Sequence, residues 1–403
     1  MTNKKIFYGW WVVISCALIG LYVGGVVFFG FTAFFLPIKE EFGWSHAQIS
    51  LAVSLQGAEM GIFAPLVGFL VDRFGPRKLI IWGIITVGSG LLLLSRTQTL
   101  LMFYVSFLLV SFGAGGCTAV VLTTAVANWF HKKIGIAMGL MGAGIGGGGL
   151  VVMLLPYLIR QFQWRTTIII LALGMLAVCI PLGIMVRNRP EQYGDVPDGN
   201  SSASPVHPTE SPDKGIEMDF KQALKNKSFI YLNIAELIRL TAIPAVILHV
   251  MPYLDSIGIS EGISGFIAGA IPLFGIAGRL GFGWLSDKMS KRYVLAITFG
   301  LLSIGTLSFA YAQAVWPIFV FLFCFPLGHG GSMVLRGAIV RDFFGRASFG
   351  KLIGIILGAG AVGGIIGPTL GGWVFDVTGS YYAVWILMSA LTALAIVMIL
   401  RIR

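Results

Sequence analysis

GFLVDRFGPRK, at residues 68–78, returns 215 residues later as GWLSDKMSKR, at residues 283–292. Each copy follows a long apolar segment and precedes another, so each is a short charged hinge between two membrane helices. A chain that repeats the same hinge is built from two equivalent halves. In membrane proteins such halves typically rock against each other around a site at their interface.

Composition supports this interpretation. Of the 403 residues, 57% are hydrophobic and only 11% are charged, whereas soluble domains carry about 25% charged residues. Twelve apolar segments have the length of about 20 residues that a membrane-spanning helix needs. The expected spans are 8–31, 47–71, 79–95, 100–127, 134–159, 166–186, 228–254, 262–286, 293–312, 315–340, 350–375 and 380–400.

The sequence therefore predicts an all-α membrane protein with twelve transmembrane helices in two pseudo-symmetric six-helix bundles. Residues 1–187 form the first bundle and residues 228–403 the second. Residues 188–227, rich in Pro, Ser and acidic side chains in their first part, form a cytoplasmic linker. We expect a functional monomer in a lipid bilayer.

The charge pattern predicts the orientation. The net charge is +11, and 21 of the 28 Lys and Arg residues fall on one face if the N-terminus is cytoplasmic. An excess of Lys and Arg in cytoplasmic loops is the positive-inside rule. We therefore expect both termini in the cytoplasm, and we attribute the basic balance to topology, not to a nucleic-acid partner.

The repeat extends beyond the hinge. Asn128-Trp129-Phe130 before the fifth span matches Asp342-Phe343-Phe344 before the eleventh, and both spans then carry a Gly-Ala-Gly stretch. In this layout the hinge resembles the G-x-x-x-D-R-x-G-x-R-[KR] motif of the major facilitator superfamily. Three stretches resemble its bacterial monocarboxylate porters and oxalate/formate antiporters: Tyr8-Gly9-Trp10-Trp11, Asn128-Trp129-Phe130 and the segment from Arg187 to Gly199. That resemblance implies an inner-membrane secondary transporter.

The hinge acids have a physical role in such a device. Asp72 and Asp287 end their helices, where each can face the positive dipole end of a neighbouring helix or basic residues of the other half. Such contacts would close the cytoplasmic side. The alternative is that the hinge charges only anchor loops among lipid headgroups. The expected gate comprises Asp72, Arg73, Arg77, Asp287, Lys288 and Arg292.

Charges inside the spans are the strongest indication of a functional site, because an unpaired charge in a bilayer is costly. Arg279 lies seven residues before Ser286, so it is about 10 Å from the end of its helix. A guanidinium at that depth offers two parallel donors to a carboxylate. The alternative is a structural pair with Glu236. In the families that this chain resembles, an Arg in the eighth helix binds the substrate carboxylate.

Other polar residues in the spans are weaker candidates. His329, Thr118 and Cys117 occupy matching places in the tenth and fourth spans, so they are candidate lining groups near the repeat interface. Candidates for carrying a proton are Glu59, Glu236 and His249. Glu236 can instead pair with Arg239, three residues away, and we expect Arg336 to snorkel toward the headgroups.

Departures from the relatives narrow the substrate. Animal monocarboxylate porters carry a Lys late in the first helix and an Asp four residues before the Arg of the eighth, where this chain has Phe29 and Gly275. These two positions therefore do not support proton coupling by that route. Oxalate antiporters carry a second cation in the eleventh helix, where this chain has Gly360. A monovalent anion fits a single deep Arg better than a dicarboxylate does.

The resulting expectation is a proton-coupled symporter of a small monocarboxylate such as lactate or pyruvate, with anion exchange as the alternative. The chain carries no HExxH, GxSxG or paired Cys/His spacing, so we expect neither an enzyme nor a metal site. The four cysteines lie inside spans as apolar side chains, and no cofactor is expected.

Overall fold

The computed structural model describes residues 7–130, 133–196, 198, 220–344 and 349–402. All regular elements among these residues are helical. The helices of the first half are α1 (Gly9–Val23), η1 (Gly24–Phe28), α2 (Phe31–Phe42), α3 (His46–Phe74), α4 (Pro76–Ser95), α5 (Leu100–Gly115), α6 (Ala119–Ala127), α7 (Ile134–Gly147), α8 (Gly149–Gly174), η2 (Met175–Cys179), α9 (Ile180–Met185) and η3 (Pro190–Tyr193).

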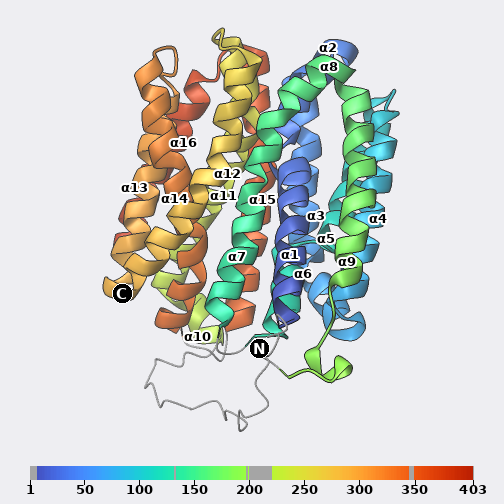
Figure 1. The fold of residues 1–403 in the computed structure, drawn as a ribbon. Coiled ribbons are helices and arrows are strands. Elements are labelled where there is room, and N and C mark those ends of the chain that lie inside the picture. Colours follow the sequence, from blue (N-terminus) through green and yellow to red (C-terminus); the bar gives the residue numbers. More distant parts are fainter. Residues whose placement is uncertain (1–6, 131–132, 197, 199–219, 345–348, 403) are drawn as a thin grey trace.

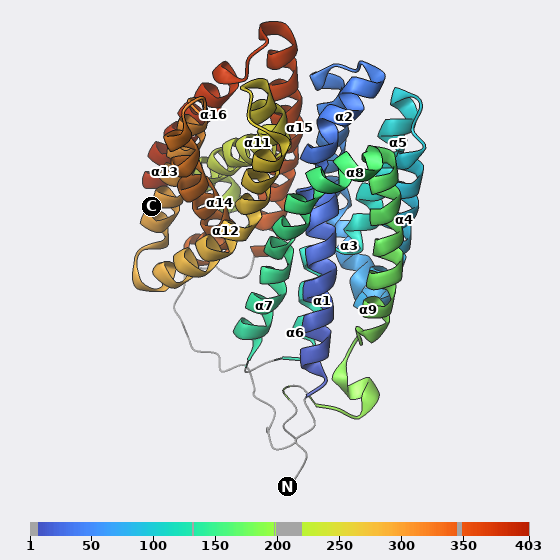
Figure 2. The ribbon, with the colours of Figure 1, turned by 45° about the horizontal axis from the view of Figure 1, so that its top comes forward.

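The second half is more regular, because each crossing is a single helix. It contains α10 (Phe220–Lys225), α11 (Lys227–Ser256), α12 (Glu261–Lys288), α13 (Lys291–Phe309), α14 (Val315–Phe344), α15 (Phe349–Thr378) and α16 (Tyr382–Leu400). Figure 1 shows α1–α9 and α11–α16 as two bundles side by side, and Figure 2 shows the same division after a turn of the molecule.

The described residues make twelve crossings once the breaks within spans are taken into account. The helical run Ile134–Met185 is 52 residues long, or about 78 Å, which is far more than one bilayer needs. It turns sharply at Gln163, whose φ of 62° and ψ of 160° are not helical, and thus crosses twice. The first crossing, Gly9–Phe42, continues eleven residues beyond its expected end. Its last turn is held by Glu41, which pairs with Arg165 at 2.6 Å.

We call the end of the bundle that carries the two hinges, the end of α9 and the start of α10 the linker side; it lies at the bottom of Figure 1. The three stretches that resemble known porters meet there. The Tyr8 hydroxyl donates to Met185 O at 2.9 Å, and Trp129 Nε1 donates to Arg187 O at 3.0 Å. The Asn128 amide donates to Asn188 O at 2.8 Å. These bonds join the start of the linker to the first bundle.

Asn188 also joins this group to the first hinge, since its Oδ1 accepts from Arg77 N at 3.0 Å. The hinge glycine Gly75 has φ 78° and ψ 157°, a region essentially restricted to glycine. A β-carbon there would lie 2.7 Å from Asn188 Cγ. In the second copy, by contrast, the corresponding Ser290 has a φ of −56°. The two hinges therefore share a sequence motif but not a backbone conformation.

Gly75→Ala is expected to destabilise the first bundle by about 2–3 kcal/mol, because backbone strain and the contact with Asn188 add. Thermal unfolding of the purified protein measures this as a lowered midpoint. Gly68→Ala is the matched control, since a β-carbon at Gly68 meets no atom within 4 Å and alanine favours the helix. Equal unfolding midpoints for Gly75→Ala and Gly68→Ala would contradict the strain and close contact attributed to Gly75.

Candidate functional site

The two halves contact each other mainly along two helix pairs, α3 with α15 and α8 with α12. Smaller contacts join α7 to α12 and α2 to α11. Contact is close on the side opposite the linker. There, a β-carbon on Gly372 would lie 2.6 Å from His46 O, and one on Gly265 would lie 2.5 Å from Pro156 Cγ. Contact between α3 and α15 continues as far as Gly61, which lies against Ala361.

Toward the linker side the same helices separate. A β-carbon added at the glycines of α7 and α15 there would meet no heavy atom within 4 Å; these are Gly135, Gly139, Gly142, Gly350, Gly354 and Gly358. α3 also bends by 56° between Phe63 and Leu66. The structure is therefore closed on the far side and open on the linker side.

Arg279 of α12 lies where this contact ends. Its Nη1 donates to the carbonyl oxygen of Gly142 on α7 at 3.0 Å, so the guanidinium bridges the two halves. Its Nε is buried and has no hydrogen-bond partner. Among the described residues no carboxylate forms an ion pair with it. A buried donor without a partner costs about 1–3 kcal/mol. This guanidinium is therefore suited to donate a hydrogen bond to an anionic oxygen.

His329 lies beside Arg279 because α12 and α14 pack through glycines. A β-carbon on the next residue, Gly330, would lie 3.1 Å from Arg279 N. Buried Nδ1 of His329 also has no hydrogen-bond partner. The structure thus brings together two of the residues proposed to bind substrate, each with an unused polar atom.

The alternative interpretation of Arg279 required an ion pair with Glu236. The structure does not contain this pair. The Glu236 carboxylate is fully buried and binds Arg239 on the same helix, with Nη2–Oε2 at 2.7 Å and Nε–Oε1 at 3.1 Å. Arg336 of α14 approaches the same carboxylate at 3.8 Å. The expected pairing of Glu236 with Arg239 is confirmed. Held between two guanidinium groups, Glu236 is poorly suited to carry a proton.

Glu59 of α3 lies in the first half, 9% exposed. Its Oε2 and the Nε2 of Gln56, one helical turn away, are buried without a hydrogen-bond partner. The other buried acid in the described ranges, Glu236, forms an ion pair. Among the described residues Glu59 is therefore the buried acid that forms no ion pair.

Cys117 and Thr118 lie at the break between α5 and α6. Cys117 is 2% exposed and its thiol donates to Ile80 O of α4 at 3.6 Å. It faces the interior of the first half, so the expectation that it lines the site is wrong. Thr118 is half-buried, and its hydroxyl donates to Gly115 O at 3.1 Å within the same break.

The expected gate residues lie on the linker side, and in the described part of the chain none of their side chains contacts the other half. Asp72 and Asp287 are exposed. Lys288 stacks on Trp284, Arg73 on Phe74, and Arg292 donates to Ile402 O at 2.7 Å. With the linker side open, the closing contact of the two acids stays a prediction for the opposite conformation.

The far side is held by a polar cluster that sequence reasoning did not find. Asp376, near the end of α15, meets the first turn of α3. Its Oδ1 accepts from His46 N and contacts His46 Nδ1, both at 2.9 Å, and its Oδ2 accepts from Ala47 N at 2.9 Å. A carboxylate at a helix N-terminus is stabilised by the free N–H groups and by the helix dipole.

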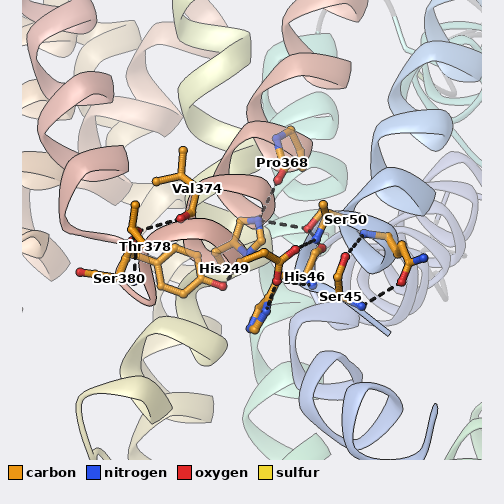
Figure 3. Close-up of polar contacts among 12 residues, drawn as sticks. Ser45, His46, Ser50, His249, Pro368, Val374, Thr378 and Ser380 are labelled. Carbon is orange, nitrogen blue, oxygen red and sulfur yellow. Dashed lines mark hydrogen bonds and ion pairs between the residues drawn. The ribbon is translucent and has the colours of Figure 1, made fainter. Parts of the chain in front are cut away.

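His249 extends this cluster across both halves. Its Nε2 contacts Pro368 O at 2.9 Å and the Ser50 hydroxyl at 3.3 Å, and its Nδ1 contacts the Tyr381 hydroxyl at 3.1 Å (Figure 3). The ring is fully buried. His249 was expected to carry a proton; these contacts instead make it part of the closed interface. We call His46, Ser50, His249, Asp376 and Tyr381 the far-side latch.

The family model of the major facilitator superfamily matches residues 17–248 and 240–403. Monocarboxylate transporter 12 of Xenopus laevis is 24% identical over 396 residues, which cover 94% of this chain and 85% of that protein. The uncharacterized MFS-type transporter YcxA of Bacillus subtilis (strain 168) is 27% identical over 364 residues, 87% of this chain and 85% of its own length.

Solved structures agree on the fold. A bacterial homologue of the human lysosomal transporter Spinster, inward-facing and occupied, has a TM-score of 0.72 at 13% identity, covering 98% of this chain and 96% of that one. The nucleoside transporter NupG has a TM-score of 0.75 at 12% identity, covering 98% and 99%. The similar proteins are transporters, not enzymes. This chain, a multi-pass membrane transporter, belongs to the major facilitator superfamily.

Proposed function

We propose that the protein carries a small monocarboxylate such as lactate or pyruvate across the inner membrane by alternating access, driven by proton symport. Arg279 binds the carboxylate. The observation that carries this proposal is the Arg279 guanidinium at the end of the contact between the halves, with a buried donor unused and no described acid paired to it.

Two further observations support the substrate class. Several similar proteins are named monocarboxylate transporters, and they match over 94–95% of this chain. The neighbouring His329 supplies a second polar atom for a hydroxyl or keto group beside the carboxylate. By the positive-inside rule the basic linker side is cytoplasmic, so the conformation described here opens inward and releases substrate to the cell interior.

Uptake of labelled lactate into proteoliposomes tests the proposal. A pH gradient, acidic outside, should accelerate uptake and drive accumulation above the external concentration. Uptake that is independent of the gradient and requires an internal anion would instead show exchange. That alternative is favoured by the lack of an acid beside Arg279 among the described residues. Absence of lactate flux in either arrangement would exclude lactate as the substrate.

Glu59→Gln is expected to abolish accumulation driven by the pH gradient while leaving exchange of external labelled lactate for internal lactate near its original rate. The reason is that glutamine keeps the shape of Glu59 but cannot release a proton. Glu261→Gln, at an exposed acid on the far side, is the matched control and should change neither rate. If Glu59→Gln still accumulates lactate, the proton is carried elsewhere.

A further inference from the structure

Arg336 was expected to snorkel toward the headgroups; in the structure its guanidinium lies 3.8 Å from Glu236 inside the bundle. Arg336 lies eight residues before Phe344, the last residue of α14, and thus about 12 Å from the end of the helix. The guanidinium is only 18% exposed. A cation in this place needs a role inside the bundle.

Pairing with Glu236 does not account for Arg336. Glu236 already receives three contacts from Arg239, between 2.7 and 3.2 Å. Arg336 approaches the same carboxylate at 3.8 Å, beyond hydrogen-bond distance, and forms no hydrogen bond in the described part of the chain. The group of two guanidiniums and one carboxylate keeps one positive charge, and Arg336 is its less satisfied member.

The packing of α14 shows which way Arg336 faces. Gly330 lies against α12, and Gly331 lies between Phe282 of α12 and Thr298 of α13. Ser332 accepts from Arg239 of α11 at 3.5 Å. At about 100° per residue, Met333 follows on the face between α11 and α12. Met333 is 42% exposed, so this face of α14 is partly uncovered at Met333.

Arg336 lies between Ser332 and Met333 on that helical wheel, on the same side of α14 as His329. It also lies six residues beyond Gly330, the residue packed against Arg279, and hence about 9 Å closer to the linker side. An anion that moves between Arg279 and the open linker side therefore passes the unsatisfied guanidinium.

We propose that Arg336 forms a second carboxylate-binding site on the linker-side wall, separate from Arg279, which holds the anion as it enters or leaves. This inference rests on the proposed transport of a carboxylate. The Arg336 site takes the carboxylate through its unused N–H donors, while Arg239 keeps Glu236 neutralised. A fork of donors on a partly hydrated Arg suits transient capture, because the bound anion loses little of its hydration.

A cysteine introduced by Met333→Cys reports on this site without requiring transport. Its reaction rates with an anionic methanethiosulfonate (ethylsulfonate) and a cationic one (ethyltrimethylammonium) measure the local potential, and the four native cysteines are buried. Arg336→Gln in the Met333→Cys protein is expected to lower the anionic-to-cationic rate ratio about tenfold. Arg336→Lys should preserve the ratio. The control Arg341→Gln, at an exposed Arg further along α14, should change it little.

Protection by saturating lactate or oxalate then separates the two sites. Either anion should slow labelling of the introduced cysteine in the Met333→Cys protein and in its Arg279→Ala derivative, but not in its Arg336→Gln derivative. Protection that survives Arg336→Gln, disappears in Arg279→Ala or is absent throughout would overturn the second site, as would an unchanged rate ratio. Protection by oxalate but not by lactate, still dependent on Arg336, would contradict lactate as the substrate and support the second site.

Discussion

Arg279→Ala is expected to raise the Kd for lactate about 150-fold and to reduce uptake to background. The substitution removes a largely buried guanidinium and both of its forked donors, and loss of one partner from a buried charge pair costs about 3 kcal/mol, which corresponds to that factor. Arg279→Lys keeps the charge without the fork, so an intermediate Kd is expected. Titration of the purified protein with lactate measures both.

The control for this prediction is Arg401→Ala, at an exposed Arg beyond α16, which should bind lactate like the native protein. Because Arg279 also bridges the halves through Gly142 O, thermal unfolding should accompany each titration. A well-folded Arg279→Ala protein with native lactate affinity would remove Arg279 from the site and, with it, the main support for the proposed substrate.

The number and order of the crossings could be predicted from the sequence, since hydropathy and helix length depend only on local residues. The pair Glu236–Arg239 was predictable for the same reason, being three residues apart on one helix. The predicted end of the first crossing was wrong because its last turn contains the charged residues Lys39 and Glu41, which lower the local hydropathy. Glu41 is held by Trp164 and Arg165 from a distant segment, a contact that local composition does not reveal.

The far-side latch could not be found by the same reasoning. His46 and Asp376 are 330 residues apart, and neither belongs to a repeated motif. Ser45 and Gln48 form a capping box that marks the start of α3, but such a box indicates a helix start and no partner. The prediction for Cys117 was wrong for a related reason. The repeat placed Cys117 opposite His329, but at the break between α5 and α6 its side chain points toward α4.

The far-side latch implies that Asp376 sets the balance between the two conformations. Opening the far side must separate α3 from α15 there, which breaks three contacts of one carboxylate at 2.9 Å. Hydrogen bonds to a charged group contribute about 1.5–3 kcal/mol each at most, and water replaces part of that loss once the side opens. A net cost of about 3 kcal/mol corresponds to a population ratio of roughly 150.

Asp376→Ala is accordingly expected to convert the protein largely from the form open on the linker side to a form open on the far side. Spin labels at Glu40 and Glu261, exposed positions in opposite halves on the far side, should move apart. Labels at Lys78 and Arg341 on the linker side should approach each other. Asp255→Ala, at an exposed acid on the far side, should leave both distances unchanged. Unaltered distances in Asp376→Ala would show that apolar packing, not the latch, keeps the far side closed.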